Sequence, residues 1–524
     1  MATLEGQQAG PTTQAPRQPA IVFIGFMGAG KTAAANAARA AGLEAIEADE
    51  LLEGELGMPI AKFFGRRGEE EFRSLESAQV SKLLDGADGG VIALGGGAVG
   101  AERVREALGR HVVVWLQVPA EEAWRRVEGS DRPLAQDRGH FEALHAERQP
   151  VYAELADAIL PPGDEEMVAR ALPSLIGLRE LPHGTRMAWA SSASGEYPAY
   201  VGGGLLAAGY WPLDSRRFCV SDSTVAGLYA QAVQPLAGLV EVEPGERAKT
   251  LPEAERVLRE LARLGMSRDD HLVALGGGVV GDLGGFCAAT YQRGVEVVQV
   301  PTTLVAQVDS AYGGKTGVDL PEAKNYVGAY HLPSAVLADT GTLATLPAQE
   351  LAAGFVEVVK TALIAGGESW ERVRALAELD PAQLGEVIFA CARTKLEIVA
   401  ADERDSGRRA VLNLGHTVGH AIEAASGYER YRHGEAVGLG LLATLRLSGA
   451  DELRDEVREL LERHRLPTRL DSAIDVESVL AAVELDKKRT ADGVGFVLLE
   501  RVGQPAIDRR LDADSVRAAV EELR

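Results

Sequence analysis

The sequence predicts an α/β protein of about three domains, of which two contain parallel sheets and the third is mainly helical. Its length of 524 residues exceeds what one hydrophobic core can use, since a domain takes about 150 residues. Short β-branched runs alternate with segments of helical period up to residue 345, and this is the pattern of βαβ units. Beyond that residue the pattern is mostly helical. A single small binding module is therefore excluded.

The first series of βαβ units covers residues 18–165. Its strand candidates are IVFIG at 21, VIAL at 91 and VVVWLQV at 112, separated by Ala-, Glu- and Arg-rich helical segments. We expect one parallel sheet with helices on both faces. A polar helix is predicted over about 164–178, and the Pro-, Gly- and Ser-rich LRELPHGTRMAWASSASGEYPA after it is predicted to be a connection. Residues 166–189 are accordingly predicted to be a linker region.

The second series covers residues 190–345 and predicts a Rossmann-like α/β domain. Its strand candidates are RFCVS at 217, HLVAL at 271, VEVVQV at 295 and AVLAD at 335. Residues 346–524 are expected to form the α-helical domain. It includes an amphipathic helix over 451–464 and a small strand pair around 495.

Composition narrows the class of partner. Acidic residues number 77 against 54 basic ones, which gives a net charge of −23, and no basic block is long enough to follow a nucleic acid backbone. The three cysteines are widely spaced without a C-x-x-C motif, as in a reduced compartment. We expect neither a membrane span nor a signal peptide, and residues 1–17 are expected to be a disordered leader. We expect a cytoplasmic protein that binds small molecules, with neither nucleic acid nor membrane as a partner.

A phosphate-binding loop follows the first strand. Gly25–Thr32 reads G-x-x-x-x-G-K-T between an apolar strand and an Ala-rich helix, the setting in which backbone N–H groups cradle phosphates. In such a loop Lys31 reaches the terminal phosphates and Thr32 offers its hydroxyl to Mg²⁺. The motif predicts ATP with Mg²⁺, and it leaves the phosphate acceptor open. The residues predicted to bind ATP and Mg²⁺ are Gly28, Ala29, Gly30, Lys31, Thr32 and Arg132.

Residues that follow the phosphate-binding loop in the sequence indicate the phosphate acceptor. Taken singly, each is ordinary, because most isolated arginines on helices are solvated. Together and in this order they resemble shikimate kinase over residues 18–165, on these residues: Asp49, Arg73, Gly95, Gly96, Gly97, Arg132 and Arg148. Another small-metabolite kinase of the P-loop type is the alternative for this domain, and acceptors such as gluconate would reveal it.

The resemblance implies a role for each of these residues. Arg73 and Arg148 would hold the shikimate carboxylate, while Asp49 orients the acceptor hydroxyl as a catalytic residue. Arg132 would close over the nucleotide as a second catalytic residue, and Gly95, Gly96 and Gly97 would present backbone to the shikimate ring. The chain departs from the family at Glu47-Ala48-Asp49, where members usually read Asp-x-Asp. The first carboxylate therefore has a stem that is longer by one methylene group.

Three histidines, His416, His420 and His433, lie within eighteen residues of the C-terminal half. His416 and His420 are spaced i, i+4, but position 417 is Thr where the H-E-x-x-H zinc peptidase motif needs Glu, so a peptidase is excluded. Packing or capping of helices remains open for a single histidine. Upstream, Glu357 and Lys360 lie one helical turn apart, which alone is most often an ion pair.

Several glycine- and lysine-rich strings precede the histidines. Gly276-x-Gly278-x-x-Gly281 meets the dinucleotide fingerprint, a weak signal by itself. A lysine-rich loop containing Lys315 and Lys324 follows it, within VPTTLVAQVDSAYGGKTGVDLPEAKN. In this order, together with ATYQRG, GFVEVVK and NLGHTVGHAIEA, the strings resemble 3-dehydroquinate synthase over residues 190–524.

This second resemblance implies a metal and a dinucleotide. Glu357, His416 and His433 would hold Zn²⁺ or Co²⁺ and leave coordination positions open for substrate hydroxyls. NAD would contact Asp222, Glu246, Lys249, Gly277, Gly278, Asp282, Thr302, Thr303, Lys324 and Thr345.

The implied substrate is 3-deoxy-D-arabino-heptulosonate 7-phosphate, which carries a carboxylate and a phosphate. An acidic protein needs a local excess of cations to bind it. The resemblance assigns it to Arg293, Lys315, Lys324, Asn325, Lys360, Lys395, Arg409, Asn413, Lys487 and Lys488. Asp309, Lys315 and His420 are the catalytic candidates for proton handling. Oxidation of a ring hydroxyl by NAD⁺ acidifies the adjacent C–H, which permits elimination of phosphate before the hydride returns.

The sequence thus predicts a bifunctional enzyme of chorismate biosynthesis, a shikimate kinase joined to a 3-dehydroquinate synthase. The resemblance to the synthase implies a homodimer through that part. Two alternatives remain for the second half. A metal- and NAD-dependent polyol dehydrogenase would accumulate NADH and would not need the lysines. A nucleotide-sensing scaffold protein would have no reason to keep metal ligands and lysines together.

Overall fold

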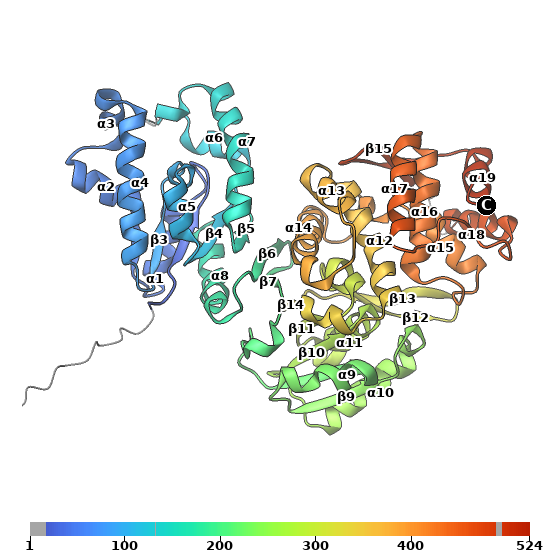
Figure 1. Cartoon of the computed structure of the whole chain (residues 1–524). Helices are drawn as coiled ribbons and strands as arrows, with labels where there is room; N and C mark the ends of the chain where they lie inside the picture. The colour runs from blue at the N-terminus through green and yellow to red at the C-terminus, as the bar shows by residue number, and fades with distance from the viewer. Residues whose placement is uncertain (1–16, 131–132, 489–494) are drawn as a thin grey trace, which may run out of the picture. The chain divides into compact units, whose positions relative to one another are not determined.

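The computed structural model describes residues 17–130, 133–488 and 495–524, and it divides into two compact units, Met1–Arg179 and Glu180–Arg524 (Figure 1). The expected leader lies outside the described residues apart from Arg17. The expected division near residue 345 lies inside the second unit, where η9 (Thr340–Thr345) leads into α12 (Ala348–Ala365). No helix among the described residues has both the length and the apolar composition of a membrane span.

The first unit contains a five-stranded, wholly parallel sheet in the order β2-β3-β1-β4-β5. Its strands are β1 (Ile21–Ile24), β2 (Ala45–Glu47), β3 (Val91–Ala93), β4 (Val112–Leu116) and β5 (Ala158–Leu160). Strands β1, β3, β4 and β5 are buried throughout, as the β-branched runs predict for a sheet covered on both faces.

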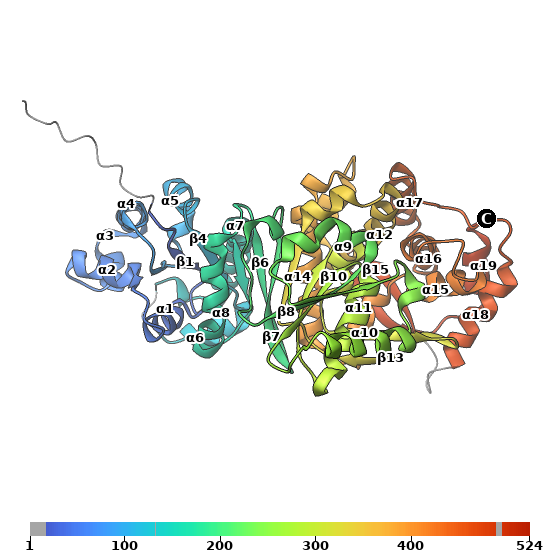
Figure 2. The same cartoon turned by 90° about the horizontal axis from the view of Figure 1, so that it is seen from below.

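Helices cover both faces of this sheet, with α4 and α5 on one side and α1 and α8 on the other (Figure 2). The helices are α1 (Lys31–Ala40), α2 (Ala48–Leu56), α3 (Ile60–Arg67), α4 (Glu69–Gly86), α5 (Glu102–Leu108), α6 (Ala120–Val127), α7 (Arg138–Leu155) and α8 (Glu165–Gly177). The predicted architecture of this unit is confirmed. Helix α1 begins at the phosphate-binding loop.

The stretch predicted to be a linker, residues 166–189, is largely regular structure. Helix α8 fills its first part, with Asp164 accepting a hydrogen bond from the backbone N–H of Met167. The helix buries Val168, Leu172 and Leu175 and packs against α1, so it belongs to the core of the first unit. The final residues of the stretch begin β6. The high Pro, Gly and Ser content therefore reflects turns between elements and not an extended connection.

The second unit contains a seven-stranded sheet in the order β6-β7-β14-β11-β10-β8-β9. All its neighbouring pairs are parallel except β6 and β7, which form an antiparallel hairpin. The strands are β6 (Arg186–Ser192), β7 (Gly195–Gly202), β8 (Arg217–Asp222), β9 (Gly238–Val242), β10 (His271–Gly276), β11 (Glu296–Pro301) and β14 (Ala335–Asp339). The four predicted strands of this sheet are confirmed. Three further strands, β6, β7 and β9, were not predicted.

A hydrophobic core packs between this sheet and helices α10 (Leu251–Arg263) and α11 (Gly278–Thr290). Phe218, Val257, Leu272 and Leu283 are buried within it. Helix α9 (Ser223–Tyr229) directly follows β8. Cys219, Cys287 and Cys391 are buried and free, as the absence of a disulfide framework predicts. The lysine-rich segment predicted to be a loop instead forms an antiparallel hairpin of β12 (Lys315–Leu320) and β13 (Ala323–Tyr330), because it alternates Gly and β-branched residues around a short turn.

The rest of the second unit is helical, as predicted. Its helices are α12, α13 (Gly367–Arg374), α14 (Gly385–Ala401), α15 (His416–Ala425), α16 (His433–Leu447), α17 (Asp451–Arg463), α18 (Val476–Lys488) and α19 (Ala513–Glu521). Helix α17 coincides with the predicted amphipathic helix. The predicted strand pair is present as β15 (Phe496–Arg501) and β16 (Gln504–Arg509). Helix α16 packs against both α12 and α15, and this brings the predicted metal ligands together (Figure 1).

Candidate active sites

The phosphate-binding loop joins β1 to α1 in a conformation that depends on glycine. Gly28 and Gly30 have φ angles of 82° and 91°, in the left-handed region where side chains are strained. A Cβ atom on Gly28 would also lie 2.9 Å from the carbonyl oxygen of Ala123. Lys31 donates from Nζ to the carbonyl oxygens of Gly25 and Phe26, both at 2.9 Å. Its ammonium group is thereby held over the loop, beside the exposed Thr32 at the start of α1.

A cavity of about 610 Å³ in the same unit brings together three of the residues predicted to bind shikimate, Arg73, Gly97 and Arg148. Arg148 donates from Nη1 to the carbonyl oxygen of Gly96 at 3.0 Å. Tyr152 donates to the same oxygen at 2.6 Å. Two guanidinium groups and a glycine backbone therefore share one wall, an arrangement suited to a small carboxylate.

Close approach explains why residues 95 and 97 are glycines. A Cβ atom on Gly97 would lie 2.1 Å from Nη1 of Arg73. On Gly95 it would lie 2.5 Å from Oδ1 of Asp49 and 2.8 Å from Oε1 of Glu76. Asp49, at the start of α2, therefore lies directly against the glycine segment.

Glu76 is a buried carboxylate of this site that the sequence prediction missed. It is 4% exposed, and its Oε2 accepts a 2.7 Å hydrogen bond from Nη1 of Arg73. Burial raises the pKa of Glu76, while Arg73 opposes that rise. Its place three residues after Arg73 on α4 puts both on one helix face, and this spacing is the signal that would have identified it.

Glu47, where the chain departs from the family pattern, forms an ion pair with Arg39. Glu47 accepts a 3.1 Å hydrogen bond from Nη1 of Arg39, on the last turn of α1. Its carboxylate thus contacts the end of α1 away from the phosphate-binding loop at Thr32. Arg132, predicted to close over the nucleotide, lies outside the described residues.

The second unit contains a larger cavity, of about 960 Å³. It opens where β8, β10 and β11 end, which is where ligands bind to parallel sheets, and α15 and α16 close its far side. Most of the residues predicted to bind NAD line it: Asp222, Glu246, Lys249, Gly277, Gly278, Asp282, Thr303 and Lys324. Thr302 is buried beside this wall, and Thr345 shares a 2.7 Å hydrogen bond with the hydroxyl of Tyr229.

One wall of the cavity carries a buried ion pair. Nζ of Lys249 lies 2.6 Å from Oδ2 of Asp282. Burial alone would lower the pKa of Lys249, but the carboxylates of Asp282 and Glu246 raise it above its usual value. The lysine is therefore cationic at neutral pH, next to the glycine turn of Gly277 and Gly278.

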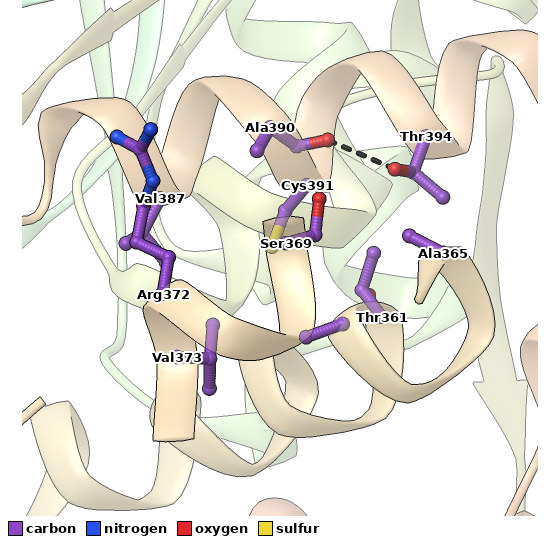
Figure 3. A pocket seen from close by; sticks show the side chains of 10 residues that line it. Thr361, Ala365, Ser369, Arg372, Val373, Val387, Ala390, Cys391 and Thr394 are labelled. Atoms are coloured by element: carbon purple, nitrogen blue, oxygen red, sulfur yellow. Dashed lines mark hydrogen bonds between the residues drawn. The ribbon is translucent and has the colours of Figure 1, made fainter. Parts of the chain in front are cut away.

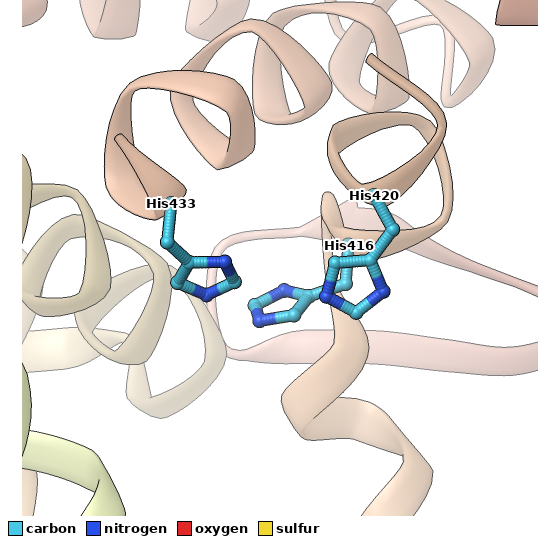
Figure 4. A group of neighbouring side chains, drawn as sticks. All are labelled: His416, His420 and His433. Atoms are coloured by element: carbon cyan, nitrogen blue, oxygen red, sulfur yellow. The ribbon is translucent and has the colours of Figure 1, made fainter. Parts of the chain in front are cut away.

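Three helices bring the predicted metal ligands together. Glu357 lies on α12 and is 1% exposed, His416 begins α15, and His433 begins α16. Oε1 of Glu357 is 3.7 Å from Nε2 of both histidines and has no hydrogen-bond partner among the described residues. The three imidazoles, His420 included, face one another (Figure 4), and their ligand atoms lie within 4.8 Å of one another. A buried carboxylate oxygen and converging imidazole nitrogens are the donor set of a divalent transition metal.

Buried cations surround this cluster. Nζ of Lys360 lies 2.5 Å from Oε2 of Glu357, and Nζ of Lys395 lies 2.7 Å from Oδ1 of Asp309, which is in a single π-helical turn. Burial opposes ionisation of Asp309, but the ammonium groups of Lys395 and Lys360 hold the pKa of this carboxyl well below its usual range. The site therefore contains fixed positive charge where the rest of the protein is acidic.

The other residues predicted to bind substrate differ in position. Asn325 lines the cavity. Arg409 is buried and donates to the carbonyl oxygens of Gly313 and Glu403. Lys315 is paired with Asp405 at the start of β12. Arg293 and Asn413 are exposed and do not line this cavity, and the side chains of Lys487 and Lys488 lie outside the described part of the chain.

A small internal space lies among α12, α13 and α14 (Figure 3). Its volume is about 10 Å³, room for about one water molecule. Burial raises the pKa of the Cys391 thiol beside it to about 12, so this cysteine is not a reactive thiolate. Thr394 donates its hydroxyl to the carbonyl oxygen of Ala390 within the helix. The space is a packing gap and not a ligand site.

Comparison with known proteins follows the division between the units. Residues 27–174 match the shikimate kinase family. Residues 239–353 match the N-terminal part of 3-dehydroquinate synthase, and residues 354–489 match its C-terminal part. A 3-dehydroquinate synthase from Symbiobacterium thermophilum is 45% identical over 351 residues, which cover 63% of this chain and 98% of that protein.

The chain belongs to the 3-dehydroquinate synthase family. Its first unit adds a shikimate kinase domain, so the prediction of a kinase joined to a lyase in one chain is confirmed. A second 3-dehydroquinate synthase, from Halorhodospira halophila, is 44% identical over 338 residues, which cover 62% of this chain and 95% of that protein.

Two solved structures resemble the synthase part of the chain. The first is 2-deoxy-scyllo-inosose synthase complexed with carbaglucose-6-phosphate, NAD⁺ and Co²⁺, with a TM-score of 0.58 and 27% identity over 64% of this chain and 99% of that one. The second is 2-epi-5-epi-valiolone synthase from Streptomyces hygroscopicus with NAD⁺ and Zn²⁺, with a TM-score of 0.56, the same identity and the same coverage of both chains.

Proposed function

We propose that the second unit of this 3-dehydroquinate synthase family member converts 3-deoxy-D-arabino-heptulosonate 7-phosphate to 3-dehydroquinate and phosphate. The observation that carries the proposal is the cluster of Glu357, His416 and His433 beside the buried Lys360 and Lys395. An anionic substrate needs these cations in a protein of net charge −23. A simple polyol dehydrogenase has no use for two buried lysines.

The residues that line the cavity and the buried residues beside it have separate roles. Glu357, His416 and His433 would hold Zn²⁺ or Co²⁺. The cavity wall that includes Asp222, Lys249 and Asp282 would hold NAD. When bound, NAD supplies reversible oxidation of a ring hydroxyl and the metal polarises that oxygen. Lys360, Lys395 and Arg409 bind the negative groups of the substrate and favour the loss of phosphate.

Proton transfer falls to residues at the edge of the cluster. His420 is exposed to the cavity, one turn from His416, and can exchange a proton with substrate. Asp309 is ionised through its contact with Lys395 and keeps that ammonium group in place. Lys315, on the β12–β13 hairpin, is the third residue proposed to take part in proton transfer.

The test of this reaction is phosphate release from the heptulosonate phosphate by purified full-length protein. We expect release that requires both NAD⁺ and Zn²⁺ and leaves no net NADH. Accumulation of NADH would instead indicate a polyol dehydrogenase. No release by metal-loaded protein with NAD⁺ would refute the proposal.

For the first unit we propose transfer of the γ-phosphoryl group of ATP to shikimate. The phosphate-binding loop would hold ATP with Mg²⁺, Arg73 and Arg148 the shikimate carboxylate, and Asp49 the acceptor hydroxyl. The cavity shared by the two arginines and the glycine backbone supports this acceptor. ADP release that depends on shikimate, and not on gluconate or nucleosides, is the expected result.

Assembly and location are further parts of the proposal. We infer that the chain forms a homodimer through its synthase part, which light scattering of the purified protein would test. A dimer that persists after removal of residues 1–179 would support this, whereas a monomer in the full-length protein would refute it. The cytoplasmic location stays a prediction from the sequence.

A further inference from the structure

A carboxylate outside the predicted ligand set lies against the histidine cluster. Glu423 is on α15, seven residues after His416 and three after His420, so all three lie on one face of the helix. Its side chain lines the large cavity yet is only 4% exposed. A carboxylate this buried needs partners for both of its oxygens.

Both partners are present. Oε2 of Glu423 accepts a 3.4 Å hydrogen bond from Nδ1 of His433, and Oε1 lies 3.8 Å from Nζ of Lys324. Lys324 in turn lies 4.0 Å from Glu246 and 4.6 Å from the centre of the Tyr428 ring. Glu423 thus connects α16 with the β13 strand of the hairpin.

The contact fixes which nitrogen of His433 can bind a metal. Nε2 of His433 faces Oε1 of Glu357 at 3.7 Å, while Nδ1 faces Glu423. An imidazole that donates from Nδ1 to a carboxylate keeps the lone pair on Nε2 and a defined ring orientation. The other ligand histidine, His416, has only a 3.3 Å contact from Nδ1 to the carbonyl oxygen of Leu414 within its own turn. His433 is therefore the ligand whose orientation depends on another helix.

We propose that Glu423 is a positioning residue of the metal centre. It holds the His433 imidazole with Nε2 toward Glu357, and Lys324 holds Glu423 from the cavity side. The inference rests on the proposed function, because it assumes that Glu357, His416 and His433 bind the metal. It adds a residue that acts on the metal centre through His433.

The test is the affinity of the full-length protein for Zn²⁺ alone, measured by competition with a chromophoric chelator. Loss of such an orienting partner costs about 10–100-fold in metal affinity. We expect Glu423→Ala to lose at least tenfold. Glu423→Gln, whose amide oxygen still accepts from Nδ1 but carries no charge, should lose about threefold. The visible absorption of the Co²⁺-loaded protein should change in the same order, because the geometry at His433 changes.

Glu429→Gln is the matched control. Glu429 lies six residues further along, is 81% exposed and, among the described residues, forms its ion pair with Arg247 at 3.5 Å. Its replacement should leave the Zn²⁺ affinity unchanged.

The outcomes separate the inference from the proposed function. If wild-type protein binds Zn²⁺ and Glu423→Ala binds it within twofold of wild type, the positioning role is refuted and the synthase proposal stands. If wild-type protein binds no Zn²⁺, the proposed function itself fails. Should Glu423→Ala not fold, the near-isosteric Glu423→Gln decides, and wild-type affinity with an unchanged Co²⁺ spectrum would overturn the inference.

Discussion

Substitution of Gly97 by alanine tests the acceptor site of the kinase most directly. The backbone of Gly97 has φ −100° and ψ −12°, which alanine adopts without strain, so only the added methyl group matters. That group would lie 2.1 Å from Nη1 and 2.5 Å from Cζ of Arg73. Since nonbonded contacts need about 3.5 Å, the guanidinium group must move by about 1.4 Å.

Movement of this size removes a defined interaction. Arg73 is held by a 2.7 Å hydrogen bond to Glu76, and a shift of its guanidinium group breaks that bond or misdirects the donors meant for a carboxylate. A hydrogen bond to a charged group contributes about 1.5–3 kcal/mol. At about 1.4 kcal/mol for each factor of ten, the KM for shikimate should rise about 10- to 150-fold.

The assay is ADP release with each substrate varied in turn. We expect the KM for shikimate to rise and the KM for ATP to stay within twofold of wild type, because the phosphate-binding loop is untouched. Phosphate release by the synthase unit in the same preparation reports whether the chain is folded and active elsewhere.

Gly100→Ala is the matched substitution. Gly100 lines the same cavity, but a Cβ atom there would meet nothing within 4 Å. It should keep the wild-type KM for shikimate. An unchanged KM in Gly97→Ala, or an equal rise in both variants, would refute the argument that close packing against Arg73 requires glycine.

Three further predictions concern the second unit. Burial lowers the pKa of His271 to about 4, where Nε2 accepts from Trp211 at 2.9 Å, so its neutral form is favoured in the folded state. Below about pH 6.5 the unfolded chain takes up a proton at His271 and the folded chain does not, so wild type should lose about 2 kcal/mol of stability between pH 7 and pH 5. The variant His271→Gln should not show this loss. Urea unfolding at both pH values measures the two stabilities, and an equal loss in wild type and variant would contradict the prediction. Lys360→Met leaves the buried Glu357 without its 2.5 Å partner and should lower the free energy of unfolding of the metal-free protein by about 3–5 kcal/mol. Added Zn²⁺ should partly restore this stability. Equal stability of variant and wild type in calorimetry would argue against a buried ion pair. A Zn²⁺-selective chelator with excess Mg²⁺ should abolish phosphate release and leave shikimate-dependent ADP release intact, whereas loss of both activities would show that they share a metal.

The sequence predicts most strongly those parts of the fold that repeat a period. The buried strands β1, β4, β10 and β11 are short, largely apolar runs, and this pattern indicates buried strands. The β6–β7 hairpin was not predicted because Ser, Gly and Pro gather around its turn, although residues 187–190 of β6 are consecutively apolar and buried. The composition of this segment disfavours a strand, but burial of its side chains in the folded protein stabilises the hairpin.

The functional residues also differ in how far the sequence predicts them. The phosphate-binding motif points to Lys31 through its fixed spacing, whereas Glu357 and His416 were expected to be ligands because of the family resemblance. Glu76 and Glu423 escaped prediction, since each acts through a neighbour and an isolated glutamate on a helix usually faces solvent. The spacing from Arg73 is a sequence signal for Glu76, whereas the burial of Glu423 follows from the packing of α15 against α16.

The three proposed metal ligands come from three helices, and Glu357 and His433 are seventy-six residues apart in the chain. A bound ion therefore acts as a cross-link among α12, α15 and α16, comparable to a disulfide that closes a long loop. A metal present at 1,000 times its dissociation constant would add about 4 kcal/mol to the stability of this unit. In a cell short of zinc, the synthase would lose resistance to proteolysis together with its activity, so its abundance would follow metal supply.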